Sequence, residues 1–215
     1  MKNKMIKSMV YDAMFLAIFV IFTFVPYLGL YTIGPVSFTI LHIFVILGAS
    51  LFGWKRGLMY GFFMGILTLF KAISYPGTFD YFFINPFISV VPRMLFGLCS
   101  GLIFDFLKKI LDQKQFTYAL IPASIVCAFL HTFFVVLFWY IFGVLDIFKI
   151  TAALGLGELV KDFTFQSFVL TFLVWGSIVE ICAAGIINPI LYSVIYKVFH
   201  VGGVKKIENP VVMNE

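Results

Sequence analysis

The stretch "PGTFDYFFINPFISVVPRMLFGL", residues 76–98, places an arginine inside a long apolar segment. Arg93 directly follows a proline, and the chain on either side is apolar enough to sit in a lipid bilayer. A charged side chain in that environment is costly unless it faces a partner or a wet cavity, and it marks a functional site by default. The surroundings of Arg93 are therefore the central question of the sequence.

The composition is that of an integral membrane protein. Of 215 residues, 62% are hydrophobic and 12% are charged, whereas soluble domains carry about 25% charged residues. A compact soluble fold of this length could not bury so much apolar surface. The net charge of +5 lies in short basic runs between apolar segments. No nucleic-acid-binding module accompanies these runs, so we expect no nucleic-acid partner.

The apolar segments predict an all-α fold, a compact bundle of six transmembrane helices that forms one domain over residues 1–215. A spanning helix needs about 20 mostly apolar residues, and continuous apolar runs favour helices over barrel strands, which alternate. The predicted spans are residues 8–28, 35–53, 57–74, 85–107, 119–145 and 164–198. The first run is long and lacks a small-residue cleavage site, so we expect no cleavable signal peptide.

The lysines and arginines predict the orientation of these spans. Eleven of them fall in the termini and in the connections on one side, and only Lys149 and Lys161 fall on the other. The side richer in lysine and arginine faces the cytoplasm. We therefore expect a multi-pass protein of the cell membrane with both termini in the cytoplasm.

Glycines at four-residue spacing mark places where helices can approach closely. Gly57, Gly61 and Gly65 form a double GxxxG pattern in the third span, and Gly97 and Gly101 repeat the spacing in the fourth. Such spacing lets helix backbones touch in lipid. Packing within one bundle is favoured over homodimerisation.

Sequence motifs of enzymes and metal sites are absent. The chain contains no HExxH, no GxSxG and no GxxxxGK[ST] motif, so it has no nucleotide site of its own. Its three cysteines lie in apolar segments without CxxC spacing and are interpreted as packing residues. We expect no metal, no cofactor and no catalytic residue, but a binding subunit that depends on the ATPase of another protein.

Polar residues from several predicted helices gather between the bilayer midplane and the outer face. The predicted topology places Arg93 on the order of 12 Å deep, at about 1.5 Å per helical residue. Such residues usually face a bundle interior or a wet cavity. The candidate substrate-binding residues are Arg93, His42, Lys71, Asn85, Glu180, His131 and Tyr75.

Each of these residues also has a purely structural interpretation. Lys71 can reach outward to the lipid headgroups, and His42 and His131 can be satisfied core histidines. Arg93 and Glu180 can form a structural ion pair. The external connection "SYPGTFDYFFIN", residues 74–85, is interpreted as a lid over a small ligand, with an interfacial aromatic belt as the alternative.

Four stretches carry a resemblance to a known family. They are "IGPVSFTILHIFVILGASLFGWKRG" (33–57), "GFFMGILTLFKA" (61–72), "NPFISVVPRMLFGL" (85–98) and "GSIVEICAAGIINPILYSVIYK" (176–197). In this order, and with the AxxxA pair Ala13 and Ala17, the chain resembles the substrate-binding S components of energy-coupling factor (ECF) vitamin transporters. It departs from the usual pattern at Phe44, where a proline is common, and at Gly53-Trp54, where "GP" is usual.

The resemblance implies a six-helix protein that binds one vitamin or precursor near the extracellular side. It also implies association with a transmembrane scaffold subunit, through Ala13 and Ala17, and with two ATPase subunits. In that family the S component topples in the membrane to deliver its ligand inward.

The pattern is most similar to the branch that handles pantothenate, pyridoxine and hydroxymethylpyrimidine. Pantothenate is the favoured ligand of the three if Arg93, assisted by His42, Lys71 and Asn85, binds a carboxylate. A neutral ring such as pyridoxine is favoured if Glu180 neutralises Arg93. The alternative function is a membrane assembly protein that holds partners through its glycine faces and binds no metabolite.

Overall fold

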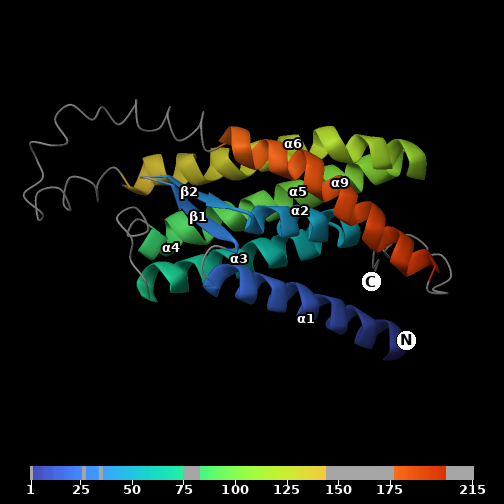
Figure 1. Ribbon diagram of the computed structural model, residues 1–215, viewed down its shortest axis with the longest axis horizontal. Helices are drawn as coiled ribbons and strands as arrows, with labels where there is room; N and C mark the ends of the chain where they lie inside the picture. Colours follow the sequence, from blue (N-terminus) through green and yellow to red (C-terminus); the bar gives the residue numbers. More distant parts are fainter. Residues whose placement is uncertain (1, 26–27, 34–35, 75–82, 144–176, 202–215) are drawn as a thin grey trace, which may run out of the picture.

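The computed structural model describes residues 2–25, 28–33, 36–74, 83–143 and 177–201, which form a helical bundle with a small β-hairpin at one end (Figure 1). Within these described ranges, four stretches are long and apolar enough to cross a membrane: Trp54–Ser74, Pro86–Ile110, Gln113–Phe142 and Ser177–Lys197. The elements in chain order are α1 (Lys2–Phe24), β1 (Leu30–Ile33), β2 (Val36–Thr39), α2 (Leu41–Phe52), α3 (Trp54–Ser74), α4 (Pro86–Ser89), α5 (Val91–Ile110), α6 (Gln113–Phe138), the π-helix η2 (Trp139–Gly143) and α9 (Ser177–Val201).

Most of the predicted spans correspond to helices. The spans predicted at 57–74, 85–107 and 119–145 are confirmed, although α6 already begins at Gln113. The first predicted span is helical as α1, but its apolar part, Ser8–Phe24, is shorter than the four stretches above. In the last predicted span, α9 begins at Ser177, and residues 164–176 lie outside the described part of the chain.

The prediction of a helical span over residues 35–53 is wrong in its first part, while the helical bundle itself is confirmed for the described residues. Residues Val36–Thr39 form strand β2, which pairs antiparallel with β1 in a register that sets Leu30 opposite Thr39. The sequence "VSFT" alternates apolar and polar residues, as a strand does, but a hydropathy count over 20 residues does not detect so short an alternation. Helix α2 therefore begins only at Leu41.

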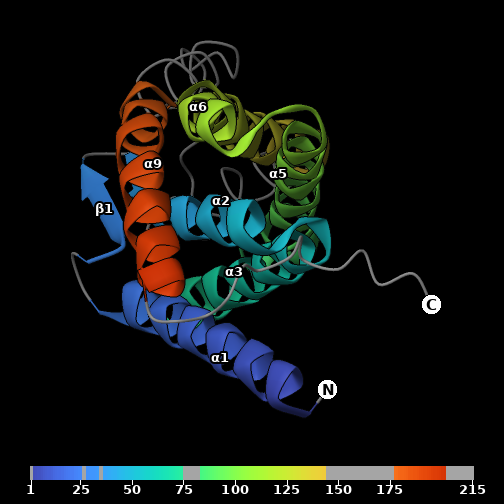
Figure 2. The ribbon, with the colours of Figure 1, turned by 90° about the vertical axis from the view of Figure 1, so that its right-hand side faces the viewer.

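Helix α2 lies in the middle of the bundle, enclosed by α3, α5, α6 and α9 (Figure 2). Every residue from Val45 to Ser50 is buried, as expected for a helix that is apolar on all sides. It ends at Gly53, whose φ of 85° favours glycine. The next helix begins at Trp54, whose backbone N–H donates to a carboxylate oxygen of Asp105 (3.0 Å). A Cβ on Gly53 would also collide with that carboxylate.

The glycine motifs are used for packing between α3 and α5. A Cβ on Gly57 would collide with the backbone oxygen of Gly97, and a Cβ on Gly97 would collide with that of Gly57. A Cβ on Gly61 would meet the backbone of Arg93. These contacts confirm the prediction that the GxxxG spacing serves packing within the bundle.

Helix α1 lies at the edge of the bundle and is anchored to α3 by a polar cluster. The Tyr60 hydroxyl donates to Asp12 Oδ1 (2.6 Å), and Arg56 Nε lies 3.2 Å from the same oxygen. The Phe15 ring stacks on Tyr60, with centroids 4.9 Å apart. This docking leaves Ala13 and Ala17 on the exposed face of α1.

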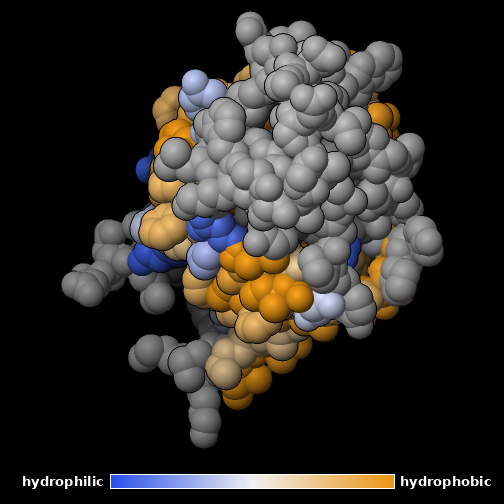
Figure 3. All heavy atoms as spheres, turned by 90° about the vertical axis from the view of Figure 1, so that its left-hand side faces the viewer, coloured by the Kyte–Doolittle hydropathy of each residue, from blue (hydrophilic) through white to orange (hydrophobic). Residues whose placement is uncertain are grey.

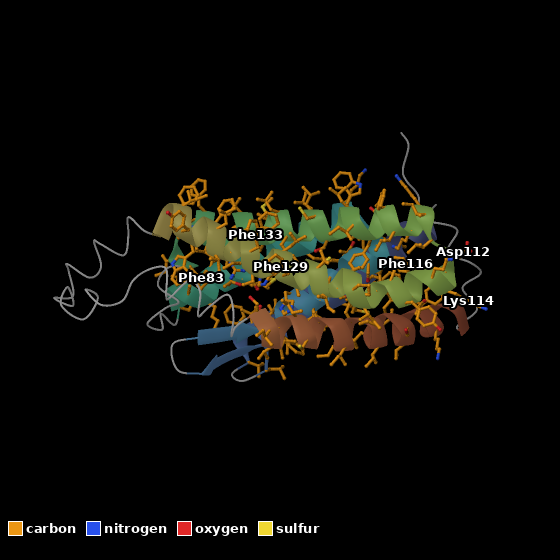
Figure 4. The ribbon with its side chains drawn as sticks, turned by 90° about the horizontal axis from the view of Figure 1, so that it is seen from above. Phe83, Asp112, Lys114, Phe116, Phe129 and Phe133 are labelled. Atoms are coloured by element: carbon orange, nitrogen blue, oxygen red, sulfur yellow. The ribbon has the colours of Figure 1, made fainter. Side chains whose placement is uncertain are left out.

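The two ends of the bundle differ. The start of α1 and the end of α9 lie at the same end, and the hairpin and α4 lie at the other (Figure 1). Asp112 and Lys114 lie at the end away from the hairpin, whereas Phe83 lies near the hairpin (Figure 4). This arrangement is compatible with both termini on one side of a membrane, and the cytoplasmic assignment of that side stays a prediction.

We predict that Gly97→Ala lowers the free energy of unfolding by about 1–3 kcal/mol, the usual cost of overpacking, because the added methyl meets rigid backbone. The measurement is thermal unfolding in detergent. The matched control is Gly185→Ala, whose methyl would meet only the flexible side chain of Ile125, at 3.0 Å. Equal stability of the two variants would contradict close packing of α3 against α5.

Candidate functional site

Arg93 lies almost fully buried, at 4% exposure, where a break separates α4 from α5. Its Nη1 donates to the backbone oxygens of Ser89 (2.6 Å) and Ile88 (3.4 Å). One face of the guanidinium covers the ring of Phe83, 5.0 Å from its centroid. Arg93 Nε is buried and has no hydrogen-bond partner among the described residues.

The neighbouring proline explains why one of these carbonyls, that of Ile88, is available. In an uninterrupted helix the oxygen of Ile88 would accept from the N–H of residue 92. Pro92 has no N–H, so the carbonyl of Ile88 lacks its normal donor. The guanidinium of Arg93 lies 3.4 Å from this oxygen and donates more closely, at 2.6 Å, to the carbonyl of Ser89. Arg93 thus provides donors at the place where the proline interrupts the helix.

Glu180, in the first turn of α9, has different partners. Its Oε1 accepts from the backbone N–H of Thr39 (2.8 Å), and its Oε2 lies 3.5 Å from the hydroxyl of Thr132. The Oε2 atom also lies 3.7 Å from Nδ1 of His131. The described residues contain no ion pair between Glu180 and Arg93 within 4.0 Å. The carboxylate instead joins the hairpin to α6 and α9.

His42 and His131 face each other across the interior. Both are buried, and their ring centroids lie 5.3 Å apart with planes 14° from parallel. Nδ1 of His42 lies 2.7 Å from the backbone oxygen of Thr39. The Phe96 ring packs edge-on against His131, at 5.0 Å. The Nε2 atoms of both histidines are buried without a hydrogen-bond partner in the part of the chain that the structure describes.

His42, His131 and Glu180 have the residue types of a metal site, and one ligand atom from each lies within 4.8 Å of the others. Imidazole lone pairs lie in the ring plane, so two rings bind one ion only if both planes pass through it. Near-parallel stacked rings direct their lone pairs along separate lines. The arrangement therefore fits separate hydrogen bonds to an organic molecule better than a single metal ion.

The structure thus brings together Arg93, His42, His131 and Glu180, all toward the hairpin end of the bundle. Hydrophilic side chains lie between hydrophobic ones on that face (Figure 3). Asn85 instead caps α4, since its side-chain oxygen accepts from the Phe87 backbone N–H (3.0 Å). Lys71 lies half-buried in the last turn of α3. Tyr75 and most of the predicted lid, residues 75–82, lie outside the described residues.

Several residues of this site are absent from the sequence prediction. Thr39 and Thr132 hold Glu180, and Phe83 and Phe96 pack against the charged and aromatic groups. Ser177 is buried, with its hydroxyl unpartnered among the described residues. Its position three residues before Glu180 places it on the same helix face, a spacing from which the sequence could have predicted it.

Comparison with known proteins identifies the family of this chain. The family model described as "ECF transporter, substrate-specific component" matches residues 7–196. The chain belongs to this family. It is therefore a subunit of a transporter rather than an enzyme. The S component is also 37% identical over 123 residues to the pantothenate transporter PanT of Leuconostoc mesenteroides. That match covers 55% of this chain and 59% of the relative's length.

We predict that Glu180→Ala destabilises this S component by about 1.5–3 kcal/mol, the usual contribution of hydrogen bonds to charged groups. The substitution leaves the Thr39 N–H without its acceptor. Glu180→Gln keeps an oxygen in reach of that N–H and should lose less. Thermal unfolding in detergent of both variants makes the comparison. An equal loss of stability in both variants would mean that the contact of Glu180 with Thr39 does not account for the stabilisation.

Proposed function

We propose that the chain is the S component that binds pantothenate, near the extracellular side of the cell membrane. The observation that carries this proposal is the buried Nε of Arg93, which has no hydrogen-bond partner among the described residues. Nη1 is used on two backbone carbonyls. The edge formed by Nε and Nη2 can bind a carboxylate through two parallel hydrogen bonds, and pantothenate carries a carboxylate.

The position of Glu180 supports an acidic ligand over a neutral ring. A neutral ligand would be favoured if Glu180 occupied the free edge of Arg93. Glu180 is instead engaged by Thr39, Thr132 and His131. Arg93 thus keeps an unused donor, Nε, in a buried place, and a charge-assisted hydrogen bond to a carboxylate would satisfy it. The match to a pantothenate transporter points the same way.

The remaining features of the proposal concern the partners. We infer cytoplasmic termini from the eleven lysines and arginines on their side of the chain. We also infer coupling to a transmembrane scaffold subunit and two ATPase subunits, with Ala13 and Ala17 as the contact to the scaffold. Their exposure on the lipid-facing side of α1 supports this contact. The alternative, an assembly protein without a ligand, relied on glycine faces that here pack α3 against α5.

We predict that the purified protein binds pantothenate and discriminates strongly against its alcohol analogue, in which a hydroxymethyl group replaces the carboxylate. Arg93→Gln should weaken pantothenate binding at least about 30-fold, since breaking a buried charge pair costs about 2–5 kcal/mol. The same variant should bind the alcohol with nearly unchanged affinity. Isothermal titration calorimetry in detergent measures all four combinations.

Arg93→Lys is the matched control, because it keeps the charge but loses the planar pair of donors. Thermal unfolding of each variant checks that it is still folded after the carbonyls of Ile88 and Ser89 lose the donor that Arg93 provides. If the unmodified protein bound pantothenate and its alcohol analogue with equal affinity, Arg93 would not contact the carboxylate. Binding of pyridoxine or hydroxymethylpyrimidine in place of pantothenate would overturn the ligand assignment.

We further predict that Ala13→Leu combined with Ala17→Leu impairs co-purification with the scaffold and ATPase subunits. Bulky side chains would separate two helices that small residues hold close in lipid. Pantothenate affinity should stay within about twofold, because this face of α1 lies away from Arg93. Val20→Leu, at an exposed position of the same helix, is the control. Undiminished assembly of the double variant would show that the scaffold binds elsewhere.

A further inference from the structure

We propose that His42 and His131 form a pair of hydrogen-bond acceptors that binds the hydroxyl or amide N–H groups of the ligand. This inference rests on the proposed function and specifies which end of the ligand lies where. The carboxylate lies at Arg93, and the uncharged polar groups lie at the two histidines. The site then selects for molecules that combine one carboxylate with several hydrogen-bond donors.

The hydrogen bond of His42 determines which of its nitrogens can accept. Nδ1 lies 2.7 Å from the backbone oxygen of Thr39. A carbonyl oxygen only accepts, so the proton of the ring is on Nδ1. In a neutral imidazole the other nitrogen then carries a lone pair. That nitrogen, Nε2, is buried and lacks a partner among the described residues, so it requires a donor from outside them.

His131 is held less closely than His42. Its Nδ1 lies 3.7 Å from Oε2 of Glu180, longer than a hydrogen bond, and has no hydrogen-bond partner among the described residues. A carboxylate oxygen attracts a proton to the facing nitrogen, which leaves Nε2 as the acceptor. That Nε2 is likewise buried and unpartnered within the described ranges.

Packing holds both rings ready for a ligand. The His131 ring lies between the near-parallel ring of His42 and the edge-on ring of Phe96. His42 is fixed by its bond to Thr39, and Thr39 in turn donates its N–H to Glu180. Hydrogen-bonding groups fixed before binding give more affinity, because little motion is lost when the ligand arrives.

The chemistry of the three groups defines the substrate class. Arg93 offers donors and a positive charge, whereas the two Nε2 atoms offer only lone pairs. Hydroxyl and amide N–H groups complement lone pairs, and a carboxylate complements the guanidinium. Pantothenate has a carboxylate at one end, hydroxyl groups at the other and an amide N–H between them. A molecule with only acceptors at its far end would leave both histidines unsatisfied.

The test combines histidine variants with pantothenate analogues that each lack one hydroxyl group. His42→Asn and His131→Asn keep an amide near the position of Nδ1 but remove the acceptor at Nε2. In the unmodified protein, loss of the correct hydroxyl should weaken binding about 5- to 30-fold, as for one hydrogen bond. In the matching variant this discrimination should fall to within about twofold. His42→Gln and His131→Gln, which return an oxygen near Nε2, should restore part of it.

A second measurement keeps the inference testable if a variant does not fold. Nitrogen-15 NMR of the histidine-labelled, unmodified protein should show both rings neutral with the proton on Nδ1. The Nε2 resonances should shift when pantothenate is added. Protonated Nε2 atoms, or variants that keep full discrimination among the analogues, would overturn the inference. If pantothenate binds and its affinity still depends on Arg93 and on the carboxylate, only the proposed roles of the two histidines are wrong. If pantothenate does not bind at all, the proposed function fails with them.

Discussion

A buried guanidinium must be surrounded by acceptors, and this requirement organises the interior around Arg93. In an apolar bundle an unpaired charge is costly, so the chain needs local groups that can share the charge of Arg93. The break between α4 and α5 supplies them, because Pro92 leaves a carbonyl without its donor. The close approach of α3, which Gly61 permits beside the Arg93 backbone, encloses the same point. Helix break, glycine contact and arginine therefore depend on one another.

The sequence predicts the helices well and the hairpin poorly, for a physical reason. Apolar length decides whether a segment can cross a bilayer, and this criterion works for α3, α5 and α6. Residues 36–39 pass the same test because the 20-residue window around them is apolar, although they alternate apolar and polar residues and pair with β1. Strand pairing depends on a partner segment, which a count along one segment does not include. Helix α2 consequently begins only at Leu41, directly after the hairpin.

For the candidate site, the sequence likewise predicts some features and not others. Residue type and approximate depth were enough to single out Arg93, His42, His131 and Glu180. Their partners could not be predicted, because those partners are mostly backbone groups. The contact from Thr39 to Glu180 joins residues 141 positions apart, and it exists only because the hairpin ends beside the first turn of α9. The ion pair of Arg93 with Glu180, one of the alternatives that the sequence leaves open, rests on charge alone and does not include the backbone as an acceptor.

The nitrogens of the Arg93 guanidinium can bind different partners at the same time, which a lysine at this position could not do. A lysine ammonium directs its donors around a single atom, so the carbonyls of Ile88 and Ser89 would compete with a ligand for the same charge. Arginine separates the two tasks, because Nη1 contacts the carbonyls at the helix break while the buried Nε has no partner among the described residues. A carboxylate at Nε would therefore leave the contacts of Nη1 with Ile88 and Ser89 in place. The structural and the binding interpretations of Arg93 are thus compatible, since each uses a different part of one side chain.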